Sequence, residues 1–226
     1  KPKTATAVNA LRGNLRGFFR FVHEAGYTRS NAGRLIRRAR CSPPPPRSLS
    51  DLERDRLLGA LASDATPEGK RDRVLVTLML GTGVRLGDAL RLDREDVDLE
   101  AGEMRLRRSK NDREEVVVLP ATERMLEARL WIAERTGHLF VGQGGKRLSA
   151  RHVQRRLGQW CERAGIQKRV TPHAMRHTFA MGLYAKTGDI ALVQAALNHR
   201  SIVSTLVYAR CDRERLKAVL GEANPR

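Results

Sequence analysis

Apolar side chains recur every three or four residues from Leu11 to Val22, which predicts an amphipathic helix whose apolar face packs. A second short helix is expected at about residues 31–40. It ends before four consecutive prolines, which cannot continue a helix and favour an extended strut. We therefore expect a helical segment over residues 1–41 and a proline-rich linker over residues 42–49.

Beyond the linker the pattern is mostly helical. Ser50 and Glu53 form a capping box, which predicts a helix that extends to about Ser63. The apolar stretch around residues 74–80 predicts a buried helix that ends at a Gly-Thr-Gly turn. Further helices are expected from Val84 or Arg85, at about residues 121–136, 150–164 and 172–187, and after Asp189. For the helix over residues 172–187 the expected N-cap is Thr171, with Pro172 at the first helical position.

Two segments between these helices have the pattern of strands. Residues 103–108 alternate apolar and charged side chains, and residues 116–119 are rich in valine. This pattern predicts a hairpin with residues 109–112 at its turn. The fold class expected for residues 50–226 is therefore mainly α (α+β), with a small antiparallel hairpin or three-stranded sheet.

The charge is strongly asymmetric. The 226 residues carry a formal net charge of +18, and residues 1–49 hold eleven Lys or Arg against one acid. Such an excess favours a polyanionic partner. Arg12, Arg16 and Arg20 follow one another at every fourth position on a helix face and are candidate phosphate contacts. Further candidate contacts with the phosphates of such a partner are Arg34, Arg37 and Arg38.

Other classes of protein are disfavoured. No apolar run approaches the length of a membrane span, which favours a soluble, intracellular protein without a membrane partner. Three widely spaced cysteines support neither a disulfide framework nor a thiolate metal site. The chain begins with Lys1 rather than Met, so we expect it to be a piece of a longer protein.

A few residues are candidates for chemistry. Arg85 follows the Gly-Thr-Gly turn, and His173 and Arg176 share one face at the start of a predicted helix, where backbone donors attract phosphate. Tyr208 is one of only three tyrosines and follows His199 by nine residues. Each signal is weak by itself.

The order of these residues is specific. An arginine after a Gly-rich turn, Lys110 on a predicted β-turn, His-x-x-Arg, Leu-x-His and a late tyrosine together resemble the tyrosine recombinase family, also called phage-type integrases. The resemblance covers about residues 50–215. Its strongest segments are residues 80–90, 172–180 and 197–208.

The resemblance implies a site-specific DNA recombinase that cleaves and rejoins strands through a 3′-phosphotyrosyl intermediate, for integration, excision or dimer resolution. Asp88 and Asn198 stand where the family commonly has Glu and Gly. By this resemblance two arginines bind the scissile phosphate, a lysine and two histidines assist the cleavage, and a tyrosine is the nucleophile. The catalytic residues that it implies are Arg85, Lys110, His173, Arg176, His199 and Tyr208.

The same resemblance implies partners and organisation. Residues 1–41 correspond to part of a core-binding domain, which clamps double-stranded DNA together with the catalytic domain over residues 50–226. A tail helix within residues 212–223 docks on a neighbouring protomer and implies a homotetramer on two DNA sites. Neither a cofactor nor a metal is expected, and the location expected is the cytoplasm, in association with the nucleoid.

Elementary chemistry agrees with these roles. Attack on a phosphodiester builds negative charge that fixed guanidinium groups stabilise. A phenol has a pKa near 10, so Tyr208 needs a proton acceptor, for which His173 is the candidate. Lys110 is the candidate donor to the leaving 5′-oxygen. Which group carries which proton stays open.

Three alternatives compete with this interpretation. His173 and His177 could bind zinc, although no third ligand is evident in the sequence. A type IB topoisomerase would use the same phosphotyrosyl chemistry, although that group usually has Lys where His173 stands. The chain could also be a non-catalytic DNA-binding protein on a helical scaffold.

Overall fold

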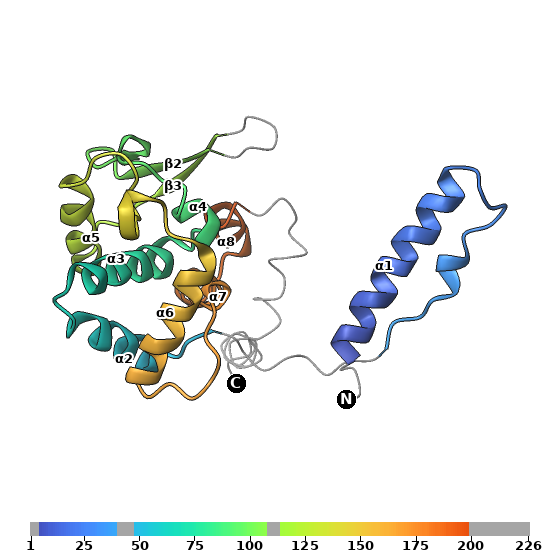
Figure 1. Ribbon diagram of the computed structural model, residues 1–226, viewed down its shortest axis with the longest axis horizontal. Coiled ribbons are helices and arrows are strands. Elements are labelled where there is room, and N and C mark those ends of the chain that lie inside the picture. The colour runs from blue at the N-terminus through green and yellow to red at the C-terminus, as the bar shows by residue number, and fades with distance from the viewer. Residues whose placement is uncertain (1–4, 40–47, 108–113, 199–226) are drawn as a thin grey trace, which may run out of the picture. The chain divides into compact units, whose positions relative to one another are not determined.

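The computed structural model describes residues 5–39, 48–107 and 114–198 of a chain that divides into two compact units, residues 1–46 and 47–226 (Figure 1). The expected mainly helical fold with a small antiparallel sheet is confirmed. In chain order the elements are α1 (Ala5–Glu24), η1 (Ala32–Leu35), α2 (Asp51–Ala62), α3 (Pro67–Thr82), α4 (Leu86–Ala89), η2 (Arg94–Asp96), β1 (Val97–Asp98), β2 (Glu103–Arg107), β3 (Glu114–Val118), α5 (Glu123–Ala133), η3 (Gln143–Gly145), α6 (Ala150–Arg163), α7 (Pro172–Thr187) and α8 (Ile190–Ala196).

In the N-terminal unit the segment after α1 runs back along that helix. The expected helix over residues 31–40 is wrong: only the single 3-10 turn η1 forms, and Ile36 is already extended. The reason is a pair of hydrogen bonds, because the Asn9 side-chain amide donates to the Ala39 carbonyl at 2.9 Å and accepts from the Ala39 amide at 2.8 Å. A helix could not reach back to Asn9 in this way.

The apolar face of α1 is largely exposed. Leu11 is 49% and Phe18 is 58% exposed, so the expectation that this face packs is not met within the described part of the unit. Among residues 7–39 only Gly33 is buried. The unit therefore shows a helix and a return segment joined by hydrogen bonds, without a hydrophobic core in these residues.

The second unit is built around α3, which Figure 1 shows among the other helices, with the sheet to one side. Leu75, Leu78 and Met79 are almost completely buried, and α3 packs against α2, α5 and α7. A helix that is apolar on several faces is stable only when it is surrounded. The described helices include none that is long and apolar enough to cross a membrane.

One buried carboxylate ties α3 to α6. Asp72 is 6% exposed and accepts hydrogen bonds from Arg71, from Arg156 at 2.6 Å and from the Trp160 indole at 3.0 Å. Buried charges need such compensation, since an unpaired carboxylate would have to be desolvated at a large cost. The pairing fixes α6 across the first half of α3.

The sheet has the order β1-β2-β3, and both pairs are antiparallel. The expected hairpin is confirmed as β2 and β3, in which Met104 faces Val117 and Arg107 faces Glu114. Met104, Leu106 and Val117 point into the core, whereas alternate residues point outward. The hairpin therefore projects from the core with residues 108–113, which lie outside the described residues, between its strands.

Hydrogen bonds fix the first described residues of the second unit, Ser48 and Leu49. The Leu49 amide donates to Thr178 Oγ1 on α7 at 2.8 Å, and Thr178 donates in turn to the Ala174 carbonyl. Lys168 Nζ donates to the Ser48 carbonyl at 2.6 Å. The first residues after the proline-rich segment are thereby bonded to α7 and to the loop before it.

Candidate active site

Arg85 begins α4 directly after the sharp end of α3. Gly83 is the C-cap of α3 with a φ of 66°, a conformation that favours glycine. A Cβ at this position would also collide with the ring of Phe179 on α7. The Gly-Thr-Gly sequence thus ends the helix and lets the chain turn within two residues to Arg85, whose side chain is 41% exposed.

A buried aspartate lies beside this arginine. Asp88 is 8% exposed, and its Oδ2 is 3.8 Å from Arg85 Nη1. Its other oxygen accepts a hydrogen bond from Arg91. The carboxylate therefore anchors two guanidinium groups at one turn of α4. The sequence analysis treated Asp88 only as a departure from the family pattern, and the spacing of three residues from Arg85 was the signal that it overlooked.

Helix α7 presents His173 in its first turn. Thr171 is the N-cap and accepts from the Ala174 amide, and Pro172 occupies the first helical position, as expected. His173 is exposed, and its ring meets the half-buried ring of His177 edge to face, with centroids 4.5 Å apart. Both imidazoles therefore lie at the same end of the helix.

Arg176 is buried to 4% exposure and connects three segments. Its Nη1 donates to the Gly83 carbonyl at 2.6 Å, and its Nη2 donates to the Leu197 carbonyl at the end of α8. Gly83 is two residues before Arg85, and Leu197 is two residues before His199. The guanidinium group thus brings together the three motifs that the sequence analysis selected.

Asn198 ends α8 in the left-handed conformation, with a φ of 48°. It is the one residue other than glycine with a positive φ among the described residues. Asparagine tolerates this conformation better than other side chains do. The replacement of the family's usual glycine at this position is therefore compatible with the turn that leads to His199.

The remaining candidates differ in whether they are described. Lys110, His199 and Tyr208 lie outside the described residues, as does the expected tail helix over residues 212–223. The six candidate DNA-binding arginines are described, and all are exposed except for the half-buried Arg12; they are Arg12, Arg16, Arg20, Arg34, Arg37 and Arg38.

No group of three or more His, Cys, Asp or Glu side chains suited to a metal gathers within residues 5–39, 48–107 and 114–198. The His173 and His177 rings contact each other, and no third ligand joins them in this part of the chain. Cys161 is buried in α6, and burial raises the pKa of its thiol to about 11. That thiol is therefore protonated at neutral pH and is a core residue.

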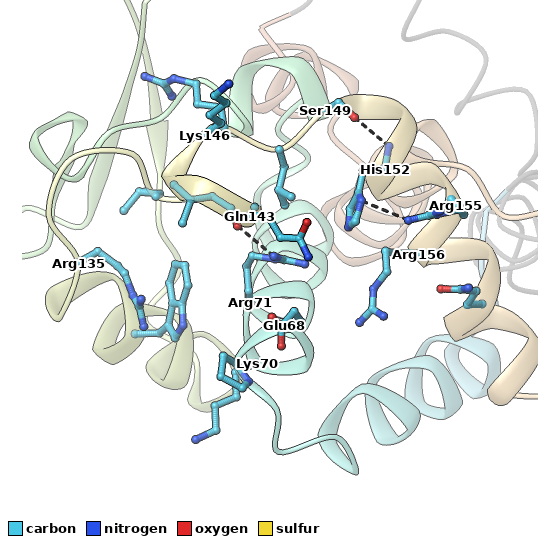
Figure 2. A pocket seen from close by; sticks show the side chains of 18 of the residues that line it. Glu68, Lys70, Arg71, Arg135, Gln143, Lys146, Ser149, His152, Arg155 and Arg156 are labelled. Atoms are coloured by element: carbon cyan, nitrogen blue, oxygen red, sulfur yellow. Dashed lines mark hydrogen bonds between the residues drawn. The ribbon is translucent and has the colours of Figure 1, made fainter.

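A large basic pocket of about 1070 Å³ lies between α3, α5 and α6, and it is not lined by Arg85, His173 or Arg176, the candidate catalytic residues that the structure describes. Figure 2 shows Arg71 near its centre, His152, Arg155 and Arg156 along α6, and Arg135 on the opposite side. The sequence analysis missed this surface. The signal was present as basic side chains at positions 152, 155 and 156, on one face of the helix it predicted.

The pKa of His152 reflects the positive charge of this pocket. Burial and the positive charges of Arg71 and Arg155 lower the pKa of the imidazole below its ordinary value of 6.5. Arg155 Nη2 is 3.5 Å from His152 Nδ1. The pocket therefore disfavours a further positive charge and favours an anion.

Comparison with known proteins identifies the fold and the family. The model of the phage integrase family matches residues 47–215. The chain is 30% identical to the tyrosine recombinase XerC of Vibrio vulnificus (strain YJ016) over 227 residues, which cover 98% of this chain and 71% of that protein. The chain belongs to the phage integrase family. It is a site-specific DNA recombinase, an enzyme that cleaves and rejoins DNA strands.

Solved structures of recombinases support the assignment of the chain to this family. The XerA recombinase is 27% identical, with a TM-score of 0.67 over 99% of this chain and 84% of the other. The XerH recombinase in its post-cleavage complex with a palindromic difH substrate is 26% identical, with a TM-score of 0.67 over 86% of this chain and 55% of the other. The resemblance stated from the sequence is thereby confirmed, and recombination is favoured over relaxation of DNA or binding alone.

We expect the left-handed turn at the end of α8 to discriminate between substitutions of Asn198. Asn198→Gly should leave the free energy of unfolding unchanged or slightly higher, because glycine adopts a positive φ without a steric cost. Asn198→Val should lower it by about 1–2 kcal/mol, because a β-branched side chain is strained there. Urea denaturation measures both values, and equal stability of the two variants would contradict the assigned conformation.

Proposed function

We propose that the recombinase cleaves DNA by attack of the Tyr208 phenolic oxygen on a phosphodiester that Arg85 and Arg176 bind. The observation that carries this proposal is the contact of Arg176 with both Gly83 and Leu197, because it joins the turn before Arg85 to the segment before His199. Two guanidinium groups stabilise the charge that develops on the pentacoordinate phosphorus.

The proton transfers follow from the chemistry of the groups. As Tyr208 Oη bonds to phosphorus, its proton passes to His173, and the bond from phosphorus to the 5′-oxygen breaks. The leaving oxygen takes a proton from Lys110, and His199 donates a hydrogen bond to the phosphate. A 3′-phosphotyrosyl bond then stores the energy of the phosphodiester, so rejoining needs neither ATP nor a resident metal.

Substitution of the nucleophile tests this reaction. Tyr208→Phe should lower the formation of detergent-stable protein–DNA adducts on the order of a thousandfold or more, because no other group provides the attacking oxygen. Tyr184→Phe is the matched control, since Tyr184 of α7 packs against the buried cluster of Ala180, Val193 and Leu197 and should retain adduct formation.

Sequencing the DNA in adducts separates the competing functions. Wild-type adducts at discrete sites indicate a recombinase, whereas adducts dispersed over genomic fragments indicate a topoisomerase. Adducts that persist in Tyr208→Phe would refute the assignment of the nucleophile, and no adducts with the wild type would indicate a binding protein.

We propose duplex DNA as the partner of both basic surfaces. The exposed arginines of α1 and of the segment after it suit phosphates, and the pocket along α6 offers cations beside a neutral imidazole. Neighbouring phosphate would offset the positive charges around His152. The two surfaces would thus contribute to one strongly salt-dependent interaction.

The pKa of His152 tests the contact in the pocket. In the free protein its NMR resonance should titrate below pH 6.5, and duplex DNA should move this pKa upward, since a phosphate stabilises the imidazolium. No shift at His152 on addition of duplex DNA would contradict a phosphate in the pocket.

We further infer a domain arrangement and an assembly. Residues 1–41 act as a partial core-binding domain, residues 42–49 as a linker, and residues 50–226 as the catalytic domain. The apolar spacing of Leu216, Val219 and Leu220 supports a tail helix that links four protomers on two DNA sites. The proposed location of the recombinase is the cytoplasm, in association with the nucleoid.

Deletion of residues 212–226 should preserve binding to one DNA site and abolish complexes of two paired sites in sedimentation. Unchanged pairing would refute the role of the tail helix.

A further inference from the structure

Two buried aspartates line a cavity of about 290 Å³ between the α4 turn and β2. Asp88, beside Arg85, is one of them, and Asp96 at the end of η2 is the other, with 5% exposure. Arg105 and Arg107 of β2 line the same cavity. Carboxylates so deeply buried require compensation, and arginines from neighbouring segments supply it here.

Asp96 is held on one side and reaches β2 on the other. Its Oδ2 accepts a hydrogen bond from the Asp93 amide at 2.9 Å, which fixes the carboxylate against η2. Its Oδ1 lies 2.8 Å from Arg107 Nε. This contact is an ion pair without the N–H alignment of a hydrogen bond. Because Asp96 is buried, the pair is screened less than two exposed charges would be.

Arg107 occupies a decisive place in the hairpin. It is the last residue of β2 and faces Glu114, the first residue of β3. In the sequence it precedes Lys110 by three residues. The contact with Asp96 therefore adds a side-chain constraint to the backbone pairing at the last described residue before Lys110.

We propose that Asp96 is a positioning residue for DNA cleavage, acting through Arg107 on the proton donor Lys110. This inference rests on the proposed function, in which Lys110 protonates the leaving 5′-oxygen. In that step the bond from phosphorus to oxygen breaks, its electron pair stays on the oxygen, and a proton moves from the Lys110 ammonium to it. Such a transfer depends on donor placement to within about 1 Å.

The chemistry of the leaving group provides a test. A substrate with sulfur in place of the bridging 5′-oxygen releases a thiolate, whose conjugate acid has a pKa near 8.5, so it needs no proton donor. Asp96→Asn keeps the size of the side chain and removes its charge. It should slow single-turnover cleavage of the oxygen substrate by about tenfold to a hundredfold. Cleavage of the sulfur substrate should stay within about threefold of the wild type, as should that by Lys110→Ala.

Two further variants make the result specific. Arg107→Gln removes the exposed partner of the pair and should show the same recovery with sulfur. Asp72→Asn is the matched control, because Asp72 is an equally buried aspartate that pairs with arginines between α3 and α6, away from β2. Any defect of this control should be equal on both substrates.

Each contrary outcome identifies what fails. If Asp96→Asn cleaves the oxygen substrate at the wild-type rate, or is slowed equally on both substrates, the positioning role is wrong. If sulfur restores Lys110→Ala but not Asp96→Asn or Arg107→Gln, this inference alone fails and the proposed reaction stands. If sulfur does not restore Lys110→Ala, the assignment of Lys110 as donor is wrong and the role of Asp96 is wrong with it. If adduct formation still depends on Tyr208 in that case, the assignment of Tyr208 as nucleophile stands independently of the roles of Lys110 and Asp96.

Discussion

The candidate active site depends on one buried guanidinium group. Arg176 donates to the carbonyl of Gly83 and to that of Leu197, which end two different helices. Last-turn carbonyls lack partners within their own helix, and a planar cation with several donors can satisfy two at once. Lysine would have to reach both carbonyls from a single nitrogen, without the planar fork of a guanidinium group. The residue that would bind phosphate is thus also the one that holds the surrounding turns, so binding and architecture share one side chain.

The acidic residues of the catalytic unit have a related role. Asp72, Asp88 and Asp96 are all less than 9% exposed, and each pairs with at least one arginine. These carboxylates are used inside the protein, whereas much of the cationic excess lies on the surface. The net charge of +18 follows from composition, but its distribution does not. Buried acids stabilise contacts between elements, and exposed arginines remain available to an anionic partner.

Local signals in the sequence anticipated most of the fold. The capping box at Ser50, the Thr171-Pro172 start and the glycine turn at Gly83 all occur as expected, because each depends on neighbouring residues alone. The expected helix over residues 31–40 failed because Asn9, thirty residues away from Ala39, captures the backbone there.

In the candidate site, too, the sequence predicts what depends on neighbouring residues and not what joins distant segments. Motif order identified Arg85, His173 and Arg176, but neither the bonds of Arg176 nor the buried pairing of Asp96 with Arg107 could be read from spacing, since both join distant segments. The basic pocket was missed for the same reason. Its walls come from α3, α5, α6 and the segment between α5 and α6, and the basic pattern noted in the sequence lies on α6 alone.

The hydrogen bond between the Leu49 amide and Thr178 has a mechanical consequence. Thr178 is two residues beyond Arg176 on the same helix, and the donor is the second described residue after the proline-rich segment. A change in the direction of the incoming chain must either rupture a buried bond or displace α7. Tension applied to the chain before Ser48 would therefore reach Arg176, the residue proposed to bind phosphate, within one turn of helix.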